Sequence, residues 1–231
     1  MKKSSIENFI NRYNLGGEVE SVKIESTDSQ MKVSFISDDK TLLGSVTSEE
    51  GDFPNGEFGI YTTSQLKALL GVLESSVNVE STDSYIKFSD KGTSVNYMLA
   101  DLSVIPVVPD LKQVPPFDAE ITLDDEFTSK FIKSKSALNE SDTFTFSCVG
   151  GKGEVVLGYS TINTNRISIN VDCKCEGDIQ PISFSAKYLK EILNANRGSK
   201  AANLKISSQG LSHIQFENDS LKSSYYLVEV K

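Results

Sequence analysis

Pairs of bulky apolar residues recur at nearly constant intervals along the chain. The intervals are 60, 62 and 61 residues, and the pairs are Phe9-Ile10, Leu69-Leu70, Phe131-Ile132 and Ile192-Leu193. In the first two windows further apolar residues stand three positions before and three after each pair, at Ile6, Tyr13, Leu66 and Leu73. This i, i+3, i+4, i+7 spacing forms one stripe of an amphipathic helix. The pattern predicts four short helices, within residues 1–14, 63–73, 124–136 and 186–200.

Between these windows the apolar residues follow a period of two. Alternating segments lie at residues 22–24, 31–35, 77–79, 85–88, 144–146, 167–171, 204–206 and 214–216. Alternation bounded by turn residues is typical of antiparallel strands with one buried face. The second and fourth intervals share one order: a strand at 59–62 or 182–185, a helix, and then three strands. We therefore expect an α+β fold whose repeat of about sixty residues holds one helix and three or four strands.

A proline-rich stretch lies near the middle of the chain. Four of the six prolines, Pro106, Pro109, Pro115 and Pro116, fall within residues 101–120. Such a segment cannot form a helix or a central strand and should run extended. It is unusually apolar for a linker, so it either packs on a sheet as a connector or forms one wall of a partner groove, and the two are compatible. We place a first domain of two repeats at 1–103, the linker at 104–117 and a second domain of two repeats at 118–231.

Positive charge is concentrated in the four helix windows. The whole chain of 231 residues carries a net charge of −9. The windows hold eleven Lys and Arg against five Asp and Glu, a net +6, which leaves −15 elsewhere. A solvated helix face explains any one window, but the bias shared by four repeats favours a common basic surface. Lysines and short polar residues without interleaved aromatic residues suit sequence-independent contact with phosphates, and not base stacking.

Motifs for catalysis or nucleotide binding are missing from the sequence. There is no Walker loop and no GxGxxG at a strand–helix turn, and residues 150–153 are a glycine-rich hairpin turn. His213 is the only histidine and has no nucleophile motif beside it. The acidic clusters at 38–39, 49–52 and 124–126 could bind Mg²⁺, but turn and cap roles explain each of them first. We expect no catalytic residue and no cofactor.

The three cysteines, Cys148, Cys173 and Cys175, are an odd number in a cysteine-poor chain. With His213 they could in principle form a zinc set. Cys-x-Cys in a strand, however, sends both thiols to one face without the turn that a ligand pair needs, so we expect no metal site. Free thiols indicate a reducing compartment, and the sequence assigns them no role. The sequence shows no signal peptide and no apolar run long enough for a membrane span, so we expect a cytoplasmic protein.

The repeat, the central linker and two stretches resemble one family. The stretches are residues 58–73 (FGIYTTSQLKALLGVL) and 223–231 (SSYYLVEVK). Together they resemble the sliding clamps that tether replicative DNA polymerases, especially those of T-even-like tailed phages, with proliferating cell nuclear antigen as a cellular relative. The resemblance implies the DNA-clamp fold, with two similar domains that each pack two helices on antiparallel sheets. It also implies a homotrimeric ring around duplex DNA, opened by a clamp-loader ATPase and bound by the polymerase, in the host cytoplasm if the chain is phage-encoded.

The resemblance also assigns residues to three surfaces. The DNA-binding residues would be Arg12, Lys67, Lys130, Lys133, Lys187, Lys190, Arg197 and Lys200. The partner groove would use Val104, Ile105, Val107, Val108, Leu111, Leu227 and Val228. The subunit interface would use the strands at 93–100 and 166–175, with Val95, Tyr97, Leu99, Ile167, Ile169 and Val171. The chain departs from the family in lacking a clear strand before its first helix and in having one basic residue, Lys67, on its second helix.

Two other classes remain open on the sequence. The first is a repeat-built, β-rich structural or interaction protein, such as a phage structural component, which would not bind DNA. A metal-dependent enzyme would use the acidic clusters, bind Mg²⁺ tightly and turn over substrate. Salt dependence of DNA association distinguishes the clamp from the first class, and turnover distinguishes it from the second.

Overall fold

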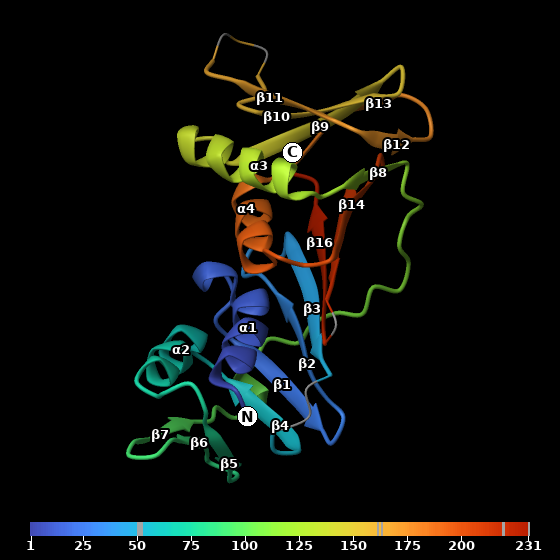
Figure 1. The fold of residues 1–231 in the computed structure, drawn as a ribbon. Coiled ribbons are helices and arrows are strands. Elements are labelled where there is room, and N and C mark those ends of the chain that lie inside the picture. The colour runs from blue at the N-terminus through green and yellow to red at the C-terminus, as the bar shows by residue number, and fades with distance from the viewer. Residues whose placement is uncertain (50–52, 161, 163, 219, 231) are drawn as a thin grey trace. The chain divides into compact units, whose positions relative to one another are not determined.

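The computed structural model describes the chain except residues 50–52, 161, 163, 219 and 231, and forms two compact units (Figure 1). Unit 1 comprises Met1–Asp38, Leu43–Pro109 and Asp219–Ser223. Unit 2 comprises Asp39–Leu42, Asp110–Asn218 and Ser224–Lys231. The main change of unit, between Pro109 and Asp110, falls inside the proline-rich stretch.

The described residues contain four α-helices, one in each window that the apolar spacing predicts, with α3 extending one residue beyond its window. They are α1 (Lys3–Asn14), α2 (Thr63–Gly71), α3 (Asp125–Ala137) and α4 (Ala186–Ala195). Two of them begin at side-chain caps: Phe127 N donates to Asp124 Oδ1 at 2.7 Å, and Tyr188 N donates to Ser185 Oγ at 3.3 Å. Such caps satisfy amides that have no partner within the helix. Helix α1 ends at Asn14, and the next residue, Leu15, has a left-handed φ of 48° and begins the short 3-10 turn η1 (Leu15–Gly17).

Unit 1 holds two groups of antiparallel strands. The first has the order β3-β2-β1-β4, formed by β1 (Val22–Thr27), β2 (Gln30–Ile36), β3 (Leu42–Ser48) and β4 (Gly56–Ile60). The second has the order β5-β6-β7, formed by β5 (Asn78–Ser81), β6 (Tyr85–Ser89) and β7 (Ser94–Met98). Strand β7 is therefore an edge of its sheet.

Unit 2 repeats this plan. One group has the order β12-β8-β14-β15-β16, formed by β8 (Ala119–Thr122), β12 (Cys173–Cys175), β14 (Ala201–Ser207), β15 (Leu211–Glu217) and β16 (Leu221–Val228), of which Leu221–Ser223 is counted in unit 1. The other has the order β11-β10-β9-β13, formed by β9 (Thr143–Val149), β10 (Lys152–Leu157), β11 (Ile167–Val171) and β13 (Ile179–Ser185). Strand β11 is an edge of this second sheet.

The order of elements confirms the predicted repeat. A strand, a helix and three strands follow one another as β4-α2-β5-β6-β7, as β8-α3-β9-β10-β11 and as β13-α4-β14-β15-β16. At the N-terminus Lys2 makes an isolated antiparallel bridge with Ser76 where the other repeats have a strand. The α+β fold class is confirmed.

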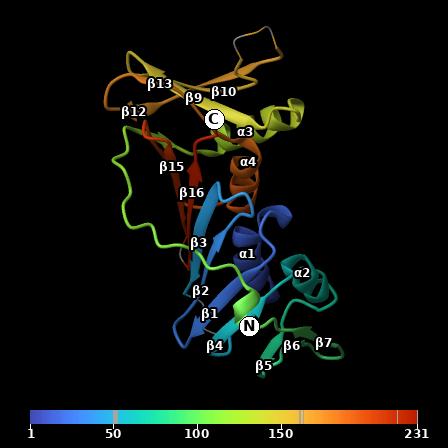
Figure 2. The same cartoon turned by 180° about the vertical axis from the view of Figure 1, so that it is seen from behind.

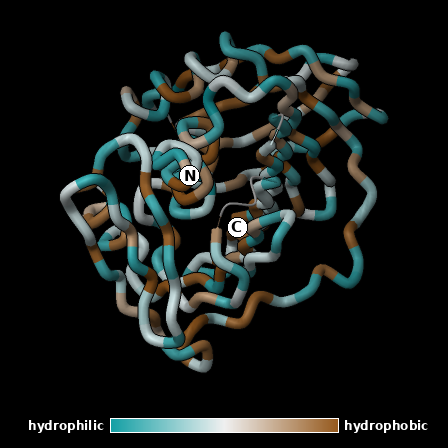
Figure 3. The backbone as a smooth tube through the Cα atoms, turned by 60° about the horizontal axis from the view of Figure 1, so that its bottom comes forward, coloured by the Kyte–Doolittle hydropathy of each residue, from teal (hydrophilic) through white to brown (hydrophobic). Residues whose placement is uncertain are grey.

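Each unit has an apolar core between its helices and its sheets. In unit 1, Phe9, Ile10 and Tyr13 of α1 are buried, and Phe9 meets Tyr13 edge-on at 5.8 Å between ring centroids. In unit 2, a chain of rings runs from Phe131 of α3 to Phe144 of β9 at 5.6 Å and on to Phe184 of β13 at 5.7 Å. Figure 3 shows apolar and polar residues alternating along extended segments, as expected for strands with one buried face.

The proline-rich stretch runs without helix or strand from residue 105 to residue 118, after the short 3-10 turn η2 (Leu102–Val104), and is the extended green segment of Figure 2. The chain just before it passes closely over β4, where Ala100 N donates to Gly59 O at 2.9 Å. A Cβ on Gly59 would lie 2.4 Å from Ala100 O, so the close approach requires glycine at this position. Ile105 lies beside Gly59 and is buried. The start of the linker is therefore fixed to unit 1.

Candidate nucleic-acid, self-association and partner surfaces

Helix α4 presents its basic residues on the side away from the core. Its buried residues are Ala186, Tyr188, Leu189, Ile192 and Leu193. Lys187, which is exposed, and Lys190, which is half-buried, lie between the buried positions, and the exposed Arg197 follows the helix. The residue after the helix is the C-cap Asn196, whose buried Nδ2 donates to Ile192 O and to Tyr225 Oη, both at 2.8 Å. Lys200 follows in an exposed turn.

Helix α3 has the same two-sided character, with an acidic first turn. Phe127 and Phe131 are buried, whereas Lys130 and Lys133 are exposed. Lys130 Nζ lies 2.6 Å from Glu126 Oε1, and this hydrogen-bonded ion pair raises the pKa of Lys130. Because the pair is exposed and i, i+4, it contributes little to stability but offsets part of the charge that a phosphate would meet.

In unit 1 the structure changes the expected basic surface. Arg12 is only 4% exposed, and its Nη1 donates to Ser223 Oγ at 3.2 Å. Its guanidinium lies inside the unit and cannot reach a phosphate, so Arg12 is removed from the DNA-binding set. Lys67 is half-buried, and its Nζ donates to Asn14 Oδ1 at 3.3 Å. Of the residues that the sequence assigns to DNA, those of α3, α4 and the turn after it are the most accessible.

The two strands expected to close a ring are both edges of their sheets, but their inward side chains are occupied. Tyr97 of β7 is buried, donates its hydroxyl hydrogen to Thr62 O at 3.3 Å, and its oxygen accepts from Thr62 N at 3.1 Å. Ile169 of β11 is likewise buried. Val95, Leu99, Ile167 and Val171 are half-buried. Tyr97 and Ile169 therefore belong to the cores, and a partner strand would meet the free edge and the outward residues such as Asn96 and Asn170, which are exposed.

The residues assigned to the partner groove differ sharply in accessibility. Val107 is 91% exposed, and Val104, Leu111 and Val228 are also exposed, whereas Val108 is half-buried. Two members are corrected because they are core residues: Ile105 packs beside Gly59, and Leu227 is 0% exposed, on the inward side of β16. What the linker offers to a partner is thus a short run of exposed valines and Leu111.

The lone histidine takes part in packing. Its ring stacks on Tyr226 at 4.3 Å between centroids and on Phe117 at 5.9 Å, and its Nε2 lies 2.7 Å from Ser224 Oγ. Burial, with a smaller contribution from nearby Lys205, lowers the pKa of His213 to about 4. The imidazole is therefore neutral at pH 7 and serves to hold Phe117, at the end of the linker, against β15 and β16.

One member of each of two acidic clusters has the local role that a turn or a cap requires. Asp124 caps α3, and Asp39 Oδ1 accepts hydrogen bonds from Thr41 N at 3.1 Å and Thr41 Oγ1 at 3.0 Å. Glu50 and Asp52 lie outside the described residues. Within the described part of the chain, the one group of side chains spaced to hold a metal ion is instead that of the three cysteines.

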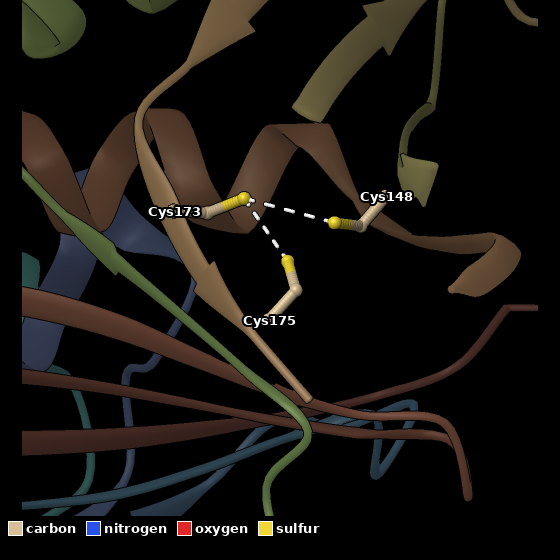
Figure 4. A group of neighbouring side chains, drawn as sticks. All are labelled: Cys148, Cys173 and Cys175. Atoms are coloured by element: carbon tan, nitrogen blue, oxygen red, sulfur yellow. Dashed lines mark hydrogen bonds between the residues drawn. The ribbon is translucent and has the colours of Figure 1, made fainter. Parts of the chain in front are cut away.

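The thiols of Cys148, Cys173 and Cys175 point toward one another from two strands of unit 2 (Figure 4). Cys173 Sγ lies 3.9 Å from Cys148 Sγ and 3.0 Å from Cys175 Sγ. Burial raises the pKa of Cys173 and of Cys175, and for Cys175 the two neighbouring thiols raise it further. The Cys-x-Cys strand does send both thiols to one face, as expected, but that face meets Cys148 of β9. The sequence could not reveal this meeting because Cys148 stands 25 residues away.

None of the helices in the described part of the chain combines the length and the apolar character needed to cross a bilayer. No protein-family model and no curated protein matches the sequence. Solved structures match it in fold. Proliferating cellular nuclear antigen (PCNA) from Entamoeba histolytica has a TM-score of 0.78 and 15% identity, with 100% of this chain and 97% of that chain covered. The structure of the C-terminal region of FEN-1 bound to A. fulgidus PCNA gives a TM-score of 0.77 at 15% identity, with the same coverage of 100% and 97%. The chain therefore has the α+β clamp fold of PCNA over its full length.

Proposed function

We propose that the chain is a non-catalytic sliding clamp, which encircles duplex DNA as a homotrimeric ring and tethers the replicative DNA polymerase for processive synthesis. The observation that carries the proposal is the match in fold to PCNA over 100% of this chain and 97% of that chain. The exposed basic sides of α3 and α4, in a chain of net charge −9, support it. An acidic remainder repels DNA and leaves the basic surface as the favourable place for it.

The number of subunits follows from the width of helices and of DNA. A helix with its side chains is about 10 Å wide, so eight helices side by side form a ring with about 15 Å clear inside. A duplex is about 20 Å wide, as its groove dimensions imply, and does not pass. Twelve helices leave about 28 Å clear. With four α-helices in the described part of each chain, two subunits are too few and three suffice.

Edge pairing between β7 of one subunit and β11 of the next would close the ring. An edge strand presents unpaired backbone groups that another strand can pair with. One chain carries both edges, one in each unit, so the contact is head to tail and closes into a ring when the rotation per subunit is right. The domain limits 1–103 and 118–231, joined by the linker at 104–117, belong to the same proposal.

Partners would bind the linker residues Val104, Val107 and Leu111, which are exposed, and Val108, which is half-buried. A short peptide that inserts a few apolar anchors is the mode of recognition that such a surface suits. The A. fulgidus PCNA structure holds the C-terminal region of its partner FEN-1, which supports a peptide-binding role for this fold. For this chain we propose the replicative polymerase and a clamp-loader ATPase as partners, a T-even-like phage as the source, and the host cytoplasm as the location.

Sedimentation equilibrium tests the ring directly. The wild-type chain should have three times the monomer mass at tens of micromolar, with dissociation at lower concentration. Like charges placed on the two outward strand faces, Asn96→Asp with Asn170→Asp, should weaken the trimer, and opposite charges, Asn96→Asp with Asn170→Lys, should preserve it. Monomer or dimer at every concentration would contradict the proposal and favour a structural or interaction protein.

A further inference from the structure

The three cysteines are separated in sequence but are brought together by two sheets of unit 2. Cys148 lies on β9, whereas Cys173 and Cys175 lie on β12, which pairs with β8 in the other sheet. All three Sγ atoms lie within 4.8 Å of one another (Figure 4). Cys148 is buried and the other two are half-buried. A cation bound to all three thiols would therefore connect the two sheets.

The spacing of the sulfur atoms suits a small thiophilic cation. Zn²⁺ binds thiolates at about 2.3 Å in tetrahedral geometry, which places neighbouring sulfur atoms about 3.8 Å apart. The Cys148–Cys173 distance of 3.9 Å meets this value. The Cys173–Cys175 distance of 3.0 Å is about 0.8 Å shorter than this ideal, so the two sulfur atoms would have to move apart by that amount on binding.

Gly153 makes the space in which the Cys173 thiol lies. It pairs with Cys148 across β9 and β10. A Cβ at this position would lie 2.5 Å from Cys173 Sγ and 2.9 Å from Val171 Cγ2. Its φ is not in the left-handed region, so the backbone alone does not require glycine here. The glycine instead leaves room for the sulfur atom.

The cluster is also accessible from solvent. A cavity of about 760 Å³ in unit 2 is lined by Gly153, Val171 and Cys173, together with the α3 cap residue Asp124 and Lys130 of α3. No His, Asp or Glu among the described residues joins the three thiols as a fourth ligand. Water entering from the cavity can take the fourth position, which is the arrangement of a three-ligand zinc site.

We propose that Cys148, Cys173 and Cys175 form a binding site for a thiophilic d¹⁰ cation, with Zn²⁺ as the ion to test. On binding, the three thiols lose their protons to solvent and become thiolate ligands, and water completes the coordination. The ion would tie β9 to β12 and so restrain the segment that directly follows edge strand β11. This site goes beyond the clamp function and does not depend on it.

The test uses the full chain under reducing conditions, with Co²⁺ and Zn²⁺ chlorides as probes. We expect one Co²⁺ per chain, with a sulfur-to-cobalt charge-transfer band and tetrahedral d–d bands, and displacement of Co²⁺ by Zn²⁺. Cys175→Ser should weaken binding by more than about tenfold, the lower end of what even the loss of an outer partner costs a metal site. Lys174→Ser, on the exposed side of β12, should bind as the wild type does.

A second variant separates metal binding from the mere presence of thiols. Gly153→Ala keeps all three cysteines but places a methyl group against Cys173 Sγ, so it should also weaken Co²⁺ binding. Circular dichroism checks that each variant is folded, and Zn²⁺ should raise the melting temperature of the wild type but not of Cys175→Ser. The proposal is overturned if the reduced wild type binds no more Co²⁺ than Cys175→Ser. It is equally overturned if the thiols form a disulfide in air and show no metal affinity after reduction.

Discussion

Replacing two lysines of the basic helices should reduce the salt dependence of DNA binding by a calculable amount. Lys133 of α3 is exposed and Lys190 of α4 is half-buried, both on the side away from the core. Lys130 is a poorer choice because its ion pair with Glu126 already offsets its charge. The double variant Lys133→Ala with Lys190→Ala therefore removes charges that a phosphate can reach, without exposing a paired carboxylate.

The magnitude follows from counterion release. Each phosphate contact contributes about 0.9 to the slope of log K against log salt. A trimer loses six lysines in the double variant. If the contacts of one subunit engage at a time, the slope falls by about 2, and if all six engage, by about 5. Because phosphates carry no sequence information, affinity should fall similarly on every duplex.

Fluorescence anisotropy on a short linear duplex, over a series of salt concentrations, measures the slope. The matched control is Lys32→Ala with Lys91→Ala, which removes the same charge from exposed positions on β2 and on the turn after β6. The control should keep the slope of the wild type. If the slope of log K against log salt fell equally in both variants, net charge alone would govern binding. That result would refute the assignment of DNA contacts to α3 and α4.

Two further predictions concern stability and partner binding. Because burial lowers the pKa of His213 from 6.5 to about 4, the unfolded chain binds the extra proton more readily, so the free energy of unfolding should fall as the pH is lowered from 6.5 to 4. His213→Gln should reduce this fall in urea titrations across that window, and an unchanged pH dependence would show that the histidine is not responsible. Val107→Asp with Val108→Asp should abolish polymerase stimulation while the mass in solution stays that of the wild type. Persisting stimulation would place the partner surface elsewhere.

Local patterns predicted the helices and many of the strands, because burial of one face imposes a period that can be read directly. Strand β8 (Ala119–Thr122) was not predicted because it has only four residues after the proline-rich stretch, too few to show an alternation of apolar and polar residues. Strand β10 (Lys152–Leu157) was not predicted because Val155, Val156 and Leu157 are all buried, so apolar and polar residues do not alternate at its end.

The accessibility of single residues was harder to predict. Arg12 lies three positions after Phe9 and next to Tyr13, at the margin of the apolar stripe of α1, and the structure places it on the buried side. Leu227 could have been recognised as inward, since it alternates with Val228 in a strand whose Tyr225 is also buried. The cysteine cluster depends on contact between two sheets, and the spacing of apolar residues within one strand or helix carries no information about such a contact.

Retention on circular against linear DNA tests the ring most directly. The protein is first diluted below the concentration at which the trimer forms, and is then concentrated together with nicked circular DNA. Under these conditions the subunits should assemble into a closed ring around the DNA. Gel filtration in moderate salt then separates DNA-bound protein from free protein. The clamp should remain on the nicked circle, and should be lost when a restriction enzyme linearises the same DNA, because a ring slides off an end. Equal retention on circular and linear DNA would show surface binding and contradict encirclement.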